Sequence, residues 1–358
     1  NEKKIPLKED IKLKRVLSVS CIFFLLFLVL LSCNFNQEAW AASTKKIGLI
    51  CATGGLGDKS FNDIAFAGAT QAKEEFNVEF DYVEPKAVAE YEGYQRDFAM
   101  SQEYEIIICI GFDQADALNK IAAEYPDQKF ALVDMAVEQP NVASLLFKAN
   151  EGSFLLGVVA ANMSQSKKIG MIGGMDIPLI RDFFVGFEAG VKWANTGAEV
   201  LPGVFVGNWA DPTKGKELAI SLIDSGADII WPSAGKSGLG ALEAVKERDV
   251  FGMGVDACQC YVNEKMLASM TKRVDIAVYE TIKSAYDGTF QGGVLEKGVA
   301  DGWVGMCRLS EEEEFWEEKY GFVHSVSFPQ KVLDIVIEAQ TKIKTGEIIV
   351  PRPTEFGG

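Results

Sequence analysis

Histidine is nearly absent from this 358-residue chain, whose single histidine is His324. The sequence also lacks the GxSxG and HExxH motifs of hydrolases and a complete GxxxxGK[ST] phosphate-binding loop. General acid–base catalysis most often uses histidine, and no motif in this chain has one nearby. We therefore expect a protein that binds a ligand without transforming it, with no catalytic residues.

Cysteine is sparse as well, with seven in the chain. Cys21 and Cys33 lie near the N-terminus, and the remaining five are Cys51, Cys109, Cys258, Cys260 and Cys307. Five is an odd number, and Cys51 and Cys109 stand at the ends of apolar segments, so we expect no disulfide framework. Cys258 and Cys260 do not have the spacing of a zinc site. The sequence thus predicts neither a metal centre nor a cofactor.

Basic residues are outnumbered, with 35 Lys and Arg against 51 Asp and Glu, and the formal net charge is −16. Nucleic acids and anionic membrane surfaces both attract clustered Lys and Arg. We therefore expect no nucleic-acid partner and no direct attraction of the folded part to a membrane.

Long apolar runs are missing except at residues 16–31. A basic segment precedes this run, and that order is typical of an export signal, whereas a membrane span needs ~20 apolar residues. The run ends at Leu31-Ser32-Cys33, which resembles the cleavage and lipidation site of bacterial lipoproteins; cleavage after Ala41 is the alternative. We expect a signal peptide at 1–33 and a tether at 34–45. The chain would then be extracytoplasmic and held at the membrane only by a lipid on Cys33.

Short apolar segments alternate with amphipathic ones along the rest of the chain. The expected strands are 46–51, 78–83, 106–110, 130–133 and 142–147 and, after a restart, 168–172, 200–206, 229–231 and 250–255. Helices are expected at 62–75, 91–102, 114–124, 180–194, 214–225, 238–248, 276–286 and 332–344. Apolar strands separated by helices indicate parallel sheets covered on both faces. Two such units predict an α/β fold of two doubly wound lobes.

The end of the chain is too short for a third domain. Residues 257–270 are expected to be irregular, and 346–351 to form a short strand. We expect the first lobe to contain 46–148 and about 257–300, and the second to contain 149–256 and about 301–353. A chain that crosses between lobes in this way predicts a hinge of several strands.

Aromatic and acidic side chains follow many of the expected strands. They are Phe61, Phe112, Asp113, Asp134, Phe183 and Asp256, with Lys272 further along the chain. Ligands of parallel α/β sheets bind at the carboxyl ends of the strands. Aromatic faces bind flat ligands, and carboxylates accept hydrogen bonds from hydroxyl and ring N–H groups. The set suits a neutral or weakly basic heterocycle that carries a sugar, and not a phosphate, which needs clustered cationic or backbone donors.

Five segments carry a family resemblance: GGLGDKSFN at 54–62, FFVGFEAG at 183–190, PSAG at 232–235, GVD at 254–256 and KIKTGEIIVP at 342–351. Together they resemble the basic membrane protein family of bacterial solute-binding lipoproteins, over about 45–353. The resemblance implies the type I periplasmic-binding-protein fold and a role as the ligand-binding component of an ABC importer, with a membrane permease as partner. The best understood members of the family bind purine nucleosides.

The resemblance also implies roles for single residues. Phe61 is expected to stack on one face of the base, and Phe183 or its neighbour Phe184 on the other. Asp256 and Lys272 are expected to hold the ribose hydroxyls. The other residues expected in the cleft are Asn62, Phe112, Asp113, Asp134 and Gly235, with Ser60 as a further candidate.

Two positions depart from the family pattern. Ala52 stands where the family has an aspartate that reaches the edge of the base, and losing such an acceptor removes an element of specificity. Asp113 is the nearby candidate that could replace it. Trp303 stands where the family has a small residue, and it offers another flat surface to a ligand.

These departures leave the ligand open between a purine nucleoside, a free purine base and riboflavin. Two further classes of function would use the same pocket. One is a nucleoside-cleaving enzyme that relies on carboxylates alone. The other is a sensory receptor domain, which would have a partner other than a permease.

Overall fold

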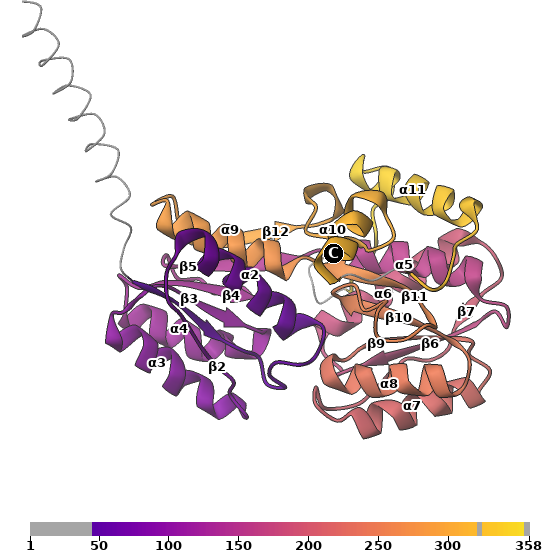
Figure 1. Ribbon diagram of the computed structural model, residues 1–358, viewed down its shortest axis with the longest axis horizontal. Helices are drawn as coiled ribbons and strands as arrows, with labels where there is room; N and C mark the ends of the chain where they lie inside the picture. Colours follow the sequence, from indigo (N-terminus) through magenta and orange to yellow (C-terminus); the bar gives the residue numbers. More distant parts are fainter. Residues whose placement is uncertain (1–44, 321–323, 354–358) are drawn as a thin grey trace, which may run out of the picture. The chain divides into compact units, whose positions relative to one another are not determined.

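The computed structural model describes residues 45–320 and 324–353, which form two α/β lobes, each around its own sheet (Figure 1). The expected signal peptide with Cys33, and the tether up to residue 44, lie outside these residues. Among the described residues, no helix is both long enough and apolar enough to cross a membrane.

The first lobe is built on a six-stranded sheet of order β12-β5-β4-β3-β1-β2, whose described pairs are all parallel. Its strands are β1 (Lys46–Ile50), β2 (Phe80–Val83), β3 (Tyr104–Ile110), β4 (Lys129–Val133), β5 (Val142–Phe147) and β12 (Gly293–Lys297). Its helical segments are α2 (Phe61–Phe76), η1 (Val88–Glu90), α3 (Tyr91–Ser101), η2 (Phe112–Gln114), α4 (Ala115–Glu124) and α9 (Val274–Tyr286). β3 is buried at almost every position, because helices cover both faces of the sheet.

The second lobe has a seven-stranded sheet of order β13-β11-β10-β9-β6-β7, with β8 also paired to β6. Its strands are β6 (Lys168–Gly173), β7 (Glu199–Val200), β8 (Val204–Phe205), β9 (Ile229–Ser233), β10 (Phe251–Asp256), β11 (Met266–Lys272) and β13 (Val304–Met306). The remaining helical segments are α5 (Ala149–Met163), α6 (Pro178–Ala194), α7 (Pro212–Asp224), α8 (Gly235–Glu247), η3 (Val299–Asp301), α10 (Ser310–Tyr320) and α11 (Gln330–Lys344). β13 runs antiparallel to β11.

The sequence interpretation missed α5 because this helix has no polar face. It is buried along most of its length, between α6, α11 and the strands β11 and β13, so its sequence lacks a helical period. The segment 257–270, expected to be irregular, contains most of β11. Ser269, Thr271 and Lys272 interrupt the apolar pattern of that strand, yet all three are buried.

Two further expectations are wrong. The single strand expected at 200–206 is two short strands, β7 and β8, because Pro202 and Gly203 interrupt it. The final strand expected at 346–351 does not form, and the chain there has no regular structure after a turn at Gly346, whose φ is 75°.

Within the described residues, the chain passes between the lobes at three places: from β5 to α5, from β11 to α9, and from β12 to β13. Figure 1 shows the orange helix α9 beside the indigo helix α2, and β12 pairs with β5 at the edge of the first sheet. The expected boundaries need correction here. Residues 266–272 belong to the second sheet, and the return to the first lobe is limited to α9 and β12.

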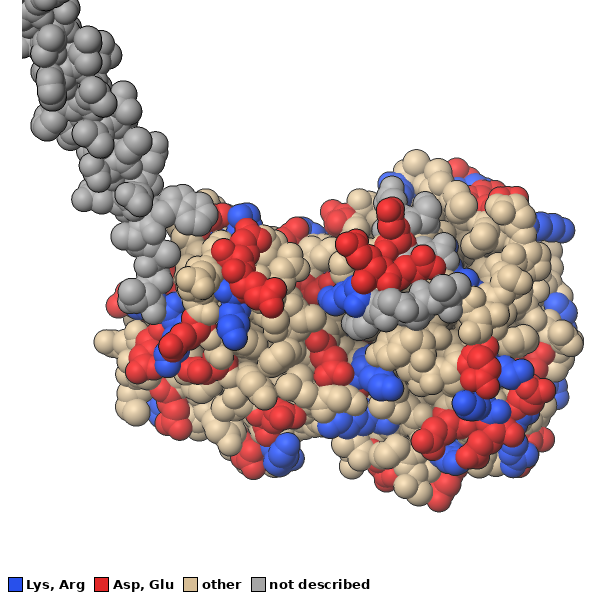
Figure 2. Space-filling model, viewed as in Figure 1, with Lys and Arg blue, Asp and Glu red and all other residues tan. Residues whose placement is uncertain are grey.

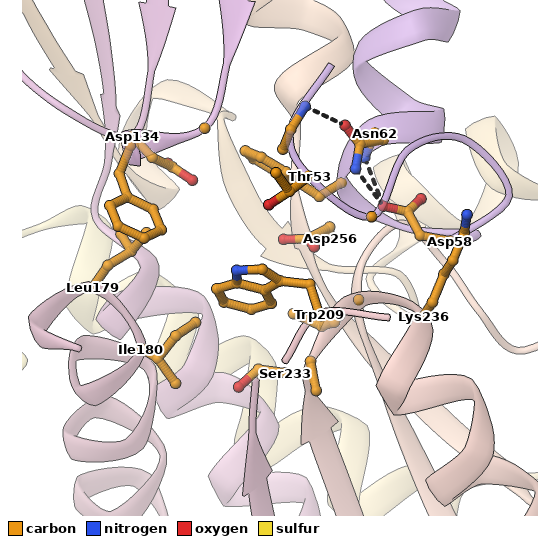
Figure 3. Close-up of a pocket in the computed structure, with 18 of the residues that line it drawn as sticks. Thr53, Asp58, Asn62, Asp134, Leu179, Ile180, Trp209, Ser233, Lys236 and Asp256 are labelled. Atoms are coloured by element: carbon orange, nitrogen blue, oxygen red, sulfur yellow. Dashed lines mark hydrogen bonds between the residues drawn. The ribbon is translucent and has the colours of Figure 1, made fainter. Parts of the chain in front are cut away.

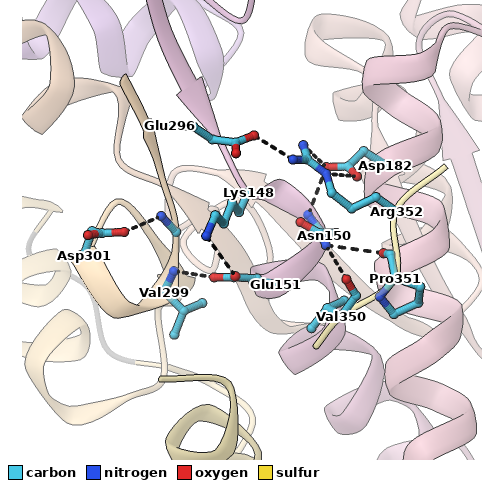
Figure 4. Close-up of polar contacts among 11 residues, drawn as sticks. Lys148, Asn150, Glu151, Asp182, Glu296, Val299, Asp301, Val350, Pro351 and Arg352 are labelled. Atoms are coloured by element: carbon cyan, nitrogen blue, oxygen red, sulfur yellow. Dashed lines mark hydrogen bonds and ion pairs between the residues drawn. The ribbon is translucent and has the colours of Figure 1, made fainter. Parts of the chain in front are cut away.

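Polar contacts hold the crossing segments together (Figure 4). Arg352 joins the lobes, because its Nε donates to Asp182 Oδ1 on α6 at 3.0 Å and its Nη1 donates to Glu296 Oε1 on β12 at 2.6 Å. Glu151 Oε2 on α5 accepts a hydrogen bond from the backbone N–H of Val299 at 2.8 Å. The predicted multi-strand hinge therefore corresponds to three neighbouring crossings with charged side chains between them.

Acidic and basic side chains are interspersed on the face shown in Figure 2. Some form exposed ion pairs, such as Lys216 with Glu247 and Arg248 with Asp224. Exposed pairs contribute about 0–1 kcal/mol each. The stability of the fold therefore comes mainly from the two buried sheets.

Candidate functional site

A cavity lies between the lobes, at the carboxyl ends of strands from both sheets (Figure 3). Its wall contains nine of the residues predicted for the site: Phe61, Asn62, Phe112, Asp113, Asp134, Phe183, Gly235, Asp256 and Lys272. The first lobe supplies the loops after β1, β3 and β4. The second supplies the start of α6, the loops after β8 and β9, and the ends of β10 and β11. Parallel sheets bind ligands at this edge.

The carboxylate of Asp58 holds the loop after β1 in shape. It accepts hydrogen bonds from the backbone N–H groups of Ser60, Asn62 and Asp63 at 2.9, 2.9 and 3.2 Å, which caps the start of α2. The side chain of Asn62 extends this network (Figure 3). Its Oδ1 accepts from the Ala52 backbone N–H at 2.9 Å, and its Nδ2 donates to Asp58 at 3.2 Å. The side-chain oxygen and nitrogen of Asn62 are thus hydrogen-bonded within the loop that carries the Phe61 ring.

Asp113 lies close to Ala52, with Gly111 between them. A Cβ atom at Gly111, whose φ is 109°, would come within 3.1 Å of both Ala52 Cβ and Asp113 Oδ1. The Tyr91 hydroxyl donates to Asp113 Oδ2 at 3.3 Å, and burial raises the pKa of the Asp113 carboxyl. A carboxylate is therefore available in this part of the wall, although Ala52 offers none.

Two aspartates end their strands with a left-handed backbone: Asp134 after β4 has a φ of 75°, and Asp256 at the end of β10 has a φ of 63°. Residues other than glycine rarely adopt this conformation, and such positions gather at functional sites. Ser60 Oγ donates to Asp256 Oδ2 at 2.6 Å. Burial raises the pKa of Asp256 to about 6. Each lobe thus contributes one strand-end carboxylate to the cavity (Figure 3).

Lys272, at the end of β11, brings a buried positive charge to the site. Its Nζ lies 2.5 Å from Asp134 Oδ2, and the two side chains are 2% and 4% exposed. The same Nζ lies 4.8 Å from the centroid of the Phe61 ring and 5.7 Å from that of Phe183. A cation within ~6 Å of an aromatic face is attracted to it. The rings of Phe61 and Phe183, both expected to stack on a ligand, therefore lie close to the Lys272 ammonium group, whose charge Asp134 neutralises.

Several contacts join the lobes directly around the cavity. The Ser60–Asp256 and Asp134–Lys272 contacts each have one partner in either lobe. Gln259 Nε2, in the turn after β10, also donates to the backbone oxygen of Lys59 at 3.1 Å. The lobes are thus closed on one another in this structure.

Comparison with known proteins identifies the family. Residues 45–351 match the model of the Bmp family, described as PnrA-like ABC transporter substrate-binding proteins. The chain belongs to this family. It is 33% identical to an uncharacterised lipoprotein of Pyrococcus abyssi, over 94% of this chain and 92% of that one. Basic membrane protein A of Borreliella burgdorferi is 31% identical, over 92% of this chain and 94% of its own length.

A solved structure supports the assignment. The solute-binding protein of an ABC transporter system from Aeropyrum pernix K1 superposes with a TM-score of 0.75 and 32% identity, over 87% of this chain and 95% of that one. The predicted periplasmic-binding-protein fold is therefore confirmed. The family consists of substrate-binding proteins, not enzymes.

The structure separates neighbouring candidates within this substrate-binding protein. Phe183 lines the cavity, whereas Phe184 stacks on Phe205 with ring centroids 5.4 Å apart. Trp303 is not in the cavity wall, which corrects its place among the candidates. It lies beside a lobe crossing, where it is 2% exposed and its ring packs against Phe147, with ring centroids 5.2 Å apart. Ser60 also lies behind the wall, where it orients Asp256.

Trp209 was not among the predicted site residues, but its indole points into the cavity (Figure 3). Gly174 makes room for the ring, since a Cβ atom there would lie 2.2 Å from it. The other wall residues that were missed include Thr53, Leu179, Ile180, Ser233 and Lys236. Position was the available signal, because each follows a strand end or begins the next helix.

Proposed function

We propose that this chain is the extracytoplasmic, lipid-anchored component of an ABC importer and that it holds a purine nucleoside, or a related flat heterocycle, between its lobes. The family assignment supports the importer role and a membrane permease as partner. Relatives from Pyrococcus abyssi and Pyrococcus horikoshii are named lipoproteins, which supports the anchor. In this chain the lipid would be carried by Cys33.

The observation that carries the ligand proposal is the placement of Phe61 and Phe183 on opposite lobes of one cavity that also holds Asp134, Asp256 and Lys272. A flat base would stack between the two rings. Sugar hydroxyls both donate and accept, so they match two carboxylates and an ammonium group. A phosphate fits poorly, because the carboxylates repel it and Asp134 already neutralises Lys272.

Binding would proceed by lobe closure about the three crossings, as in other hinged proteins. A ligand that touches both lobes favours the closed arrangement by the contacts it gains only there. The Ser60–Asp256 and Asp134–Lys272 contacts would form in the same movement. The closed surface is then the form that the permease would recognise.

Replacing Phe61 with alanine should weaken nucleoside binding by about 1–3 kcal/mol, the range for stacking of a base on an aromatic ring. Isothermal titration with inosine or adenosine measures the loss, which corresponds to a rise in Kd of about 5- to 150-fold. Phe66→Ala is a matched control on the same helix. Its ring lies against Phe80 and Tyr82 and outside the cavity wall, so the affinity should be kept. An unchanged Kd in Phe61→Ala would remove this ring from the site.

Nucleoside affinity should also fall as the pH drops through about 6, the raised pKa of Asp256. The charged groups that act on this carboxyl are Lys272, Asp134 and Asp58. Ligand hydroxyls that donate to Asp256 favour its ionised form, so binding lowers its pKa, and protonation at low pH opposes binding. The affinity should be constant above about pH 7 and decline by up to about tenfold per pH unit below 6. The decline in affinity should be absent when Asp256→Asn is titrated with nucleoside over the same pH range. Equal affinities of the parent protein above and below this range would exclude an ionised Asp256 as a ligand contact.

Mass spectrometry of the small molecule released from the purified chain tests the ligand class directly. A purine nucleoside supports the proposal, and riboflavin or a free base redirects it. Incubation with inosine addresses cleavage, since intact nucleoside is expected and released base would show an enzyme.

A further inference from the structure

Among the described residues, three buried cysteines meet in the second lobe, outside the ligand cavity. Cys258 and Cys260 lie in the turn after β10, and Cys307 directly follows β13. Their Sγ atoms all lie within 4.8 Å of one another, and the residues are 0%, 4% and 0% exposed. The sequence predicted no metal site because Cys258 and Cys260 are too close in sequence for zinc. The antiparallel pairing of β13 with β11 supplies the third thiol, which sequence spacing could not reveal.

The geometry of the cluster suits a shared metal ion. Cys260 Sγ and Cys307 Sγ are 3.8 Å apart. A disulfide requires about 2.05 Å. Two thiolates that each lie ~2.3 Å from one tetrahedral zinc ion are ~3.8 Å apart. Cys258 Sγ lies within 4.8 Å of both, so the three sulfurs can share one ion.

Two polar groups lie beside the sulfurs. The Arg308 guanidinium lies near enough to Cys260 to act on its sulfur electrostatically. The backbone N–H of Ser269 donates to Cys307 Sγ at 3.3 Å.

We propose that Cys258, Cys260 and Cys307 form a binding site for one thiophilic metal ion, Zn²⁺ or Cu⁺. Thiolates are the ligands that these ions prefer. Each thiol that coordinates the ion releases its proton, and Arg308 offsets the negative charge that the complex retains. Three thiolates complete a trigonal site for Cu⁺, whereas Zn²⁺ takes four ligands and would need a water molecule or another group in the fourth position.

The same turn connects the thiol cluster to the ligand cavity. Gln259, between two of the cysteines, accepts from the Val255 backbone N–H at 3.0 Å and reaches Lys59 in the other lobe. A bound ion would therefore fix the turn through which the second lobe contacts the loop of Phe61. The metal site does not depend on the identity of the ligand, and its test measures metal alone.

Metal binding can be measured on the whole chain, purified in detergent under anaerobic, reducing conditions and freed of metal with a chelator. Zn²⁺, Cu⁺ as its acetonitrile complex and the spectroscopic probe Co²⁺ are added in separate experiments. Elemental analysis after gel filtration should give about one ion per chain, and Co²⁺ should produce a thiolate-to-metal absorption band of the intensity expected for three thiolates. Competition against chelators of known affinity decides which ion the site prefers.

Cys260→Ala and Cys307→Ala should each abolish the cobalt band and the bound ion. Cys109→Ala is the control, because this buried thiol on β3 lies in the other lobe and should leave both unchanged. Zinc should raise the Tm of the parent and not that of Cys260→Ala.

Several results would overturn the proposal. They are a parent without stoichiometric metal, a cobalt spectrum without a thiolate band, or equal metal content in the two cluster variants and the parent. A Cys260–Cys307 disulfide in protein prepared without reductant, with no metal uptake after reduction, would show a redox pair instead. Because the cobalt spectrum is recorded on the parent, the test stands even if a variant fails to fold.

Discussion

Replacing Lys272 with methionine should abolish binding of the nucleoside proposed as the ligand. Methionine keeps an apolar stem of similar length but removes the ammonium group that Asp134 contacts at 2.5 Å. Removing one partner of a buried ion pair costs about 3–5 kcal/mol, because the other charge stays buried and unpaired. A ligand must then also bind without its charged donor, so the expected loss of affinity is at least about 100-fold.

The double variant Asp134→Asn, Lys272→Met separates folding from binding. It removes the unpaired charge, so its Tm should recover toward that of the parent, while nucleoside binding stays lost. Lys216→Met is the control, since this lysine forms ion pairs only at the surface of the second lobe and should not affect binding. Calorimetric titration and thermal unfolding measure both quantities. Parent-like affinity in Lys272→Met would place the ligand away from this lysine.

Much of the site could be predicted because chemistry and topology coincide at strand ends. The carboxyl ends of parallel strands meet at one edge of each sheet, so Asp134 and Asp256, far apart in sequence, converge on one cavity. The choice of Phe183 over Phe184 needed the structure, since neighbouring positions on a helix point in different directions. The sequence also did not reveal that Trp209 lines the cavity or that Trp303 is buried away from it, because it does not show which way a loop side chain points.

The elements that sequence did not predict lack a periodic pattern. α5 is buried on all sides and β11 carries polar residues that are buried, so neither shows the alternation by which surface elements are recognised. The thiol cluster also depends on β11, because β13, the strand directly before Cys307, pairs with it. Because the sequence did not predict β11, it predicted neither the position of the crossing from β11 to α9 nor the approach of Cys307 to Cys258 and Cys260.

The FFVGFEAG motif contributes both to helix packing and to the cavity wall. Phe183 faces the cavity, but Gly186 and Gly190 lie against α5. A Cβ atom at Gly190 would lie 2.0 Å from the backbone oxygen of Phe154, and one at Gly186 would lie 2.2 Å from that of Asn150. The glycines of the motif thus allow the backbones of α5 and α6 to touch. The sequence did not predict this packing role of the glycines, because it did not predict α5.

Replacing Gly190 with valine should therefore destabilise the protein by about 3 kcal/mol or more. Overpacking of a core usually costs 1–3 kcal/mol, and here the obstructing atom belongs to a backbone that cannot rotate away. Chemical denaturation of the ligand-free protein measures the change. Gly93→Val is the matched control, since Gly93 also lies in a helix, α3, but a Cβ atom there meets no other atom within 4 Å.

Gly93→Val should leave the free energy of unfolding close to that of the parent, because valine is a slightly better helix former than glycine. Equal denaturation midpoints for the two variants would show that α5 and α6 can separate at little cost. In Gly190→Val, the expected displacement of α6 from α5 should also affect ligand binding. α6 also carries Leu179, Ile180 and Phe183 into the cavity wall, so a displaced helix should weaken nucleoside binding along with the fold.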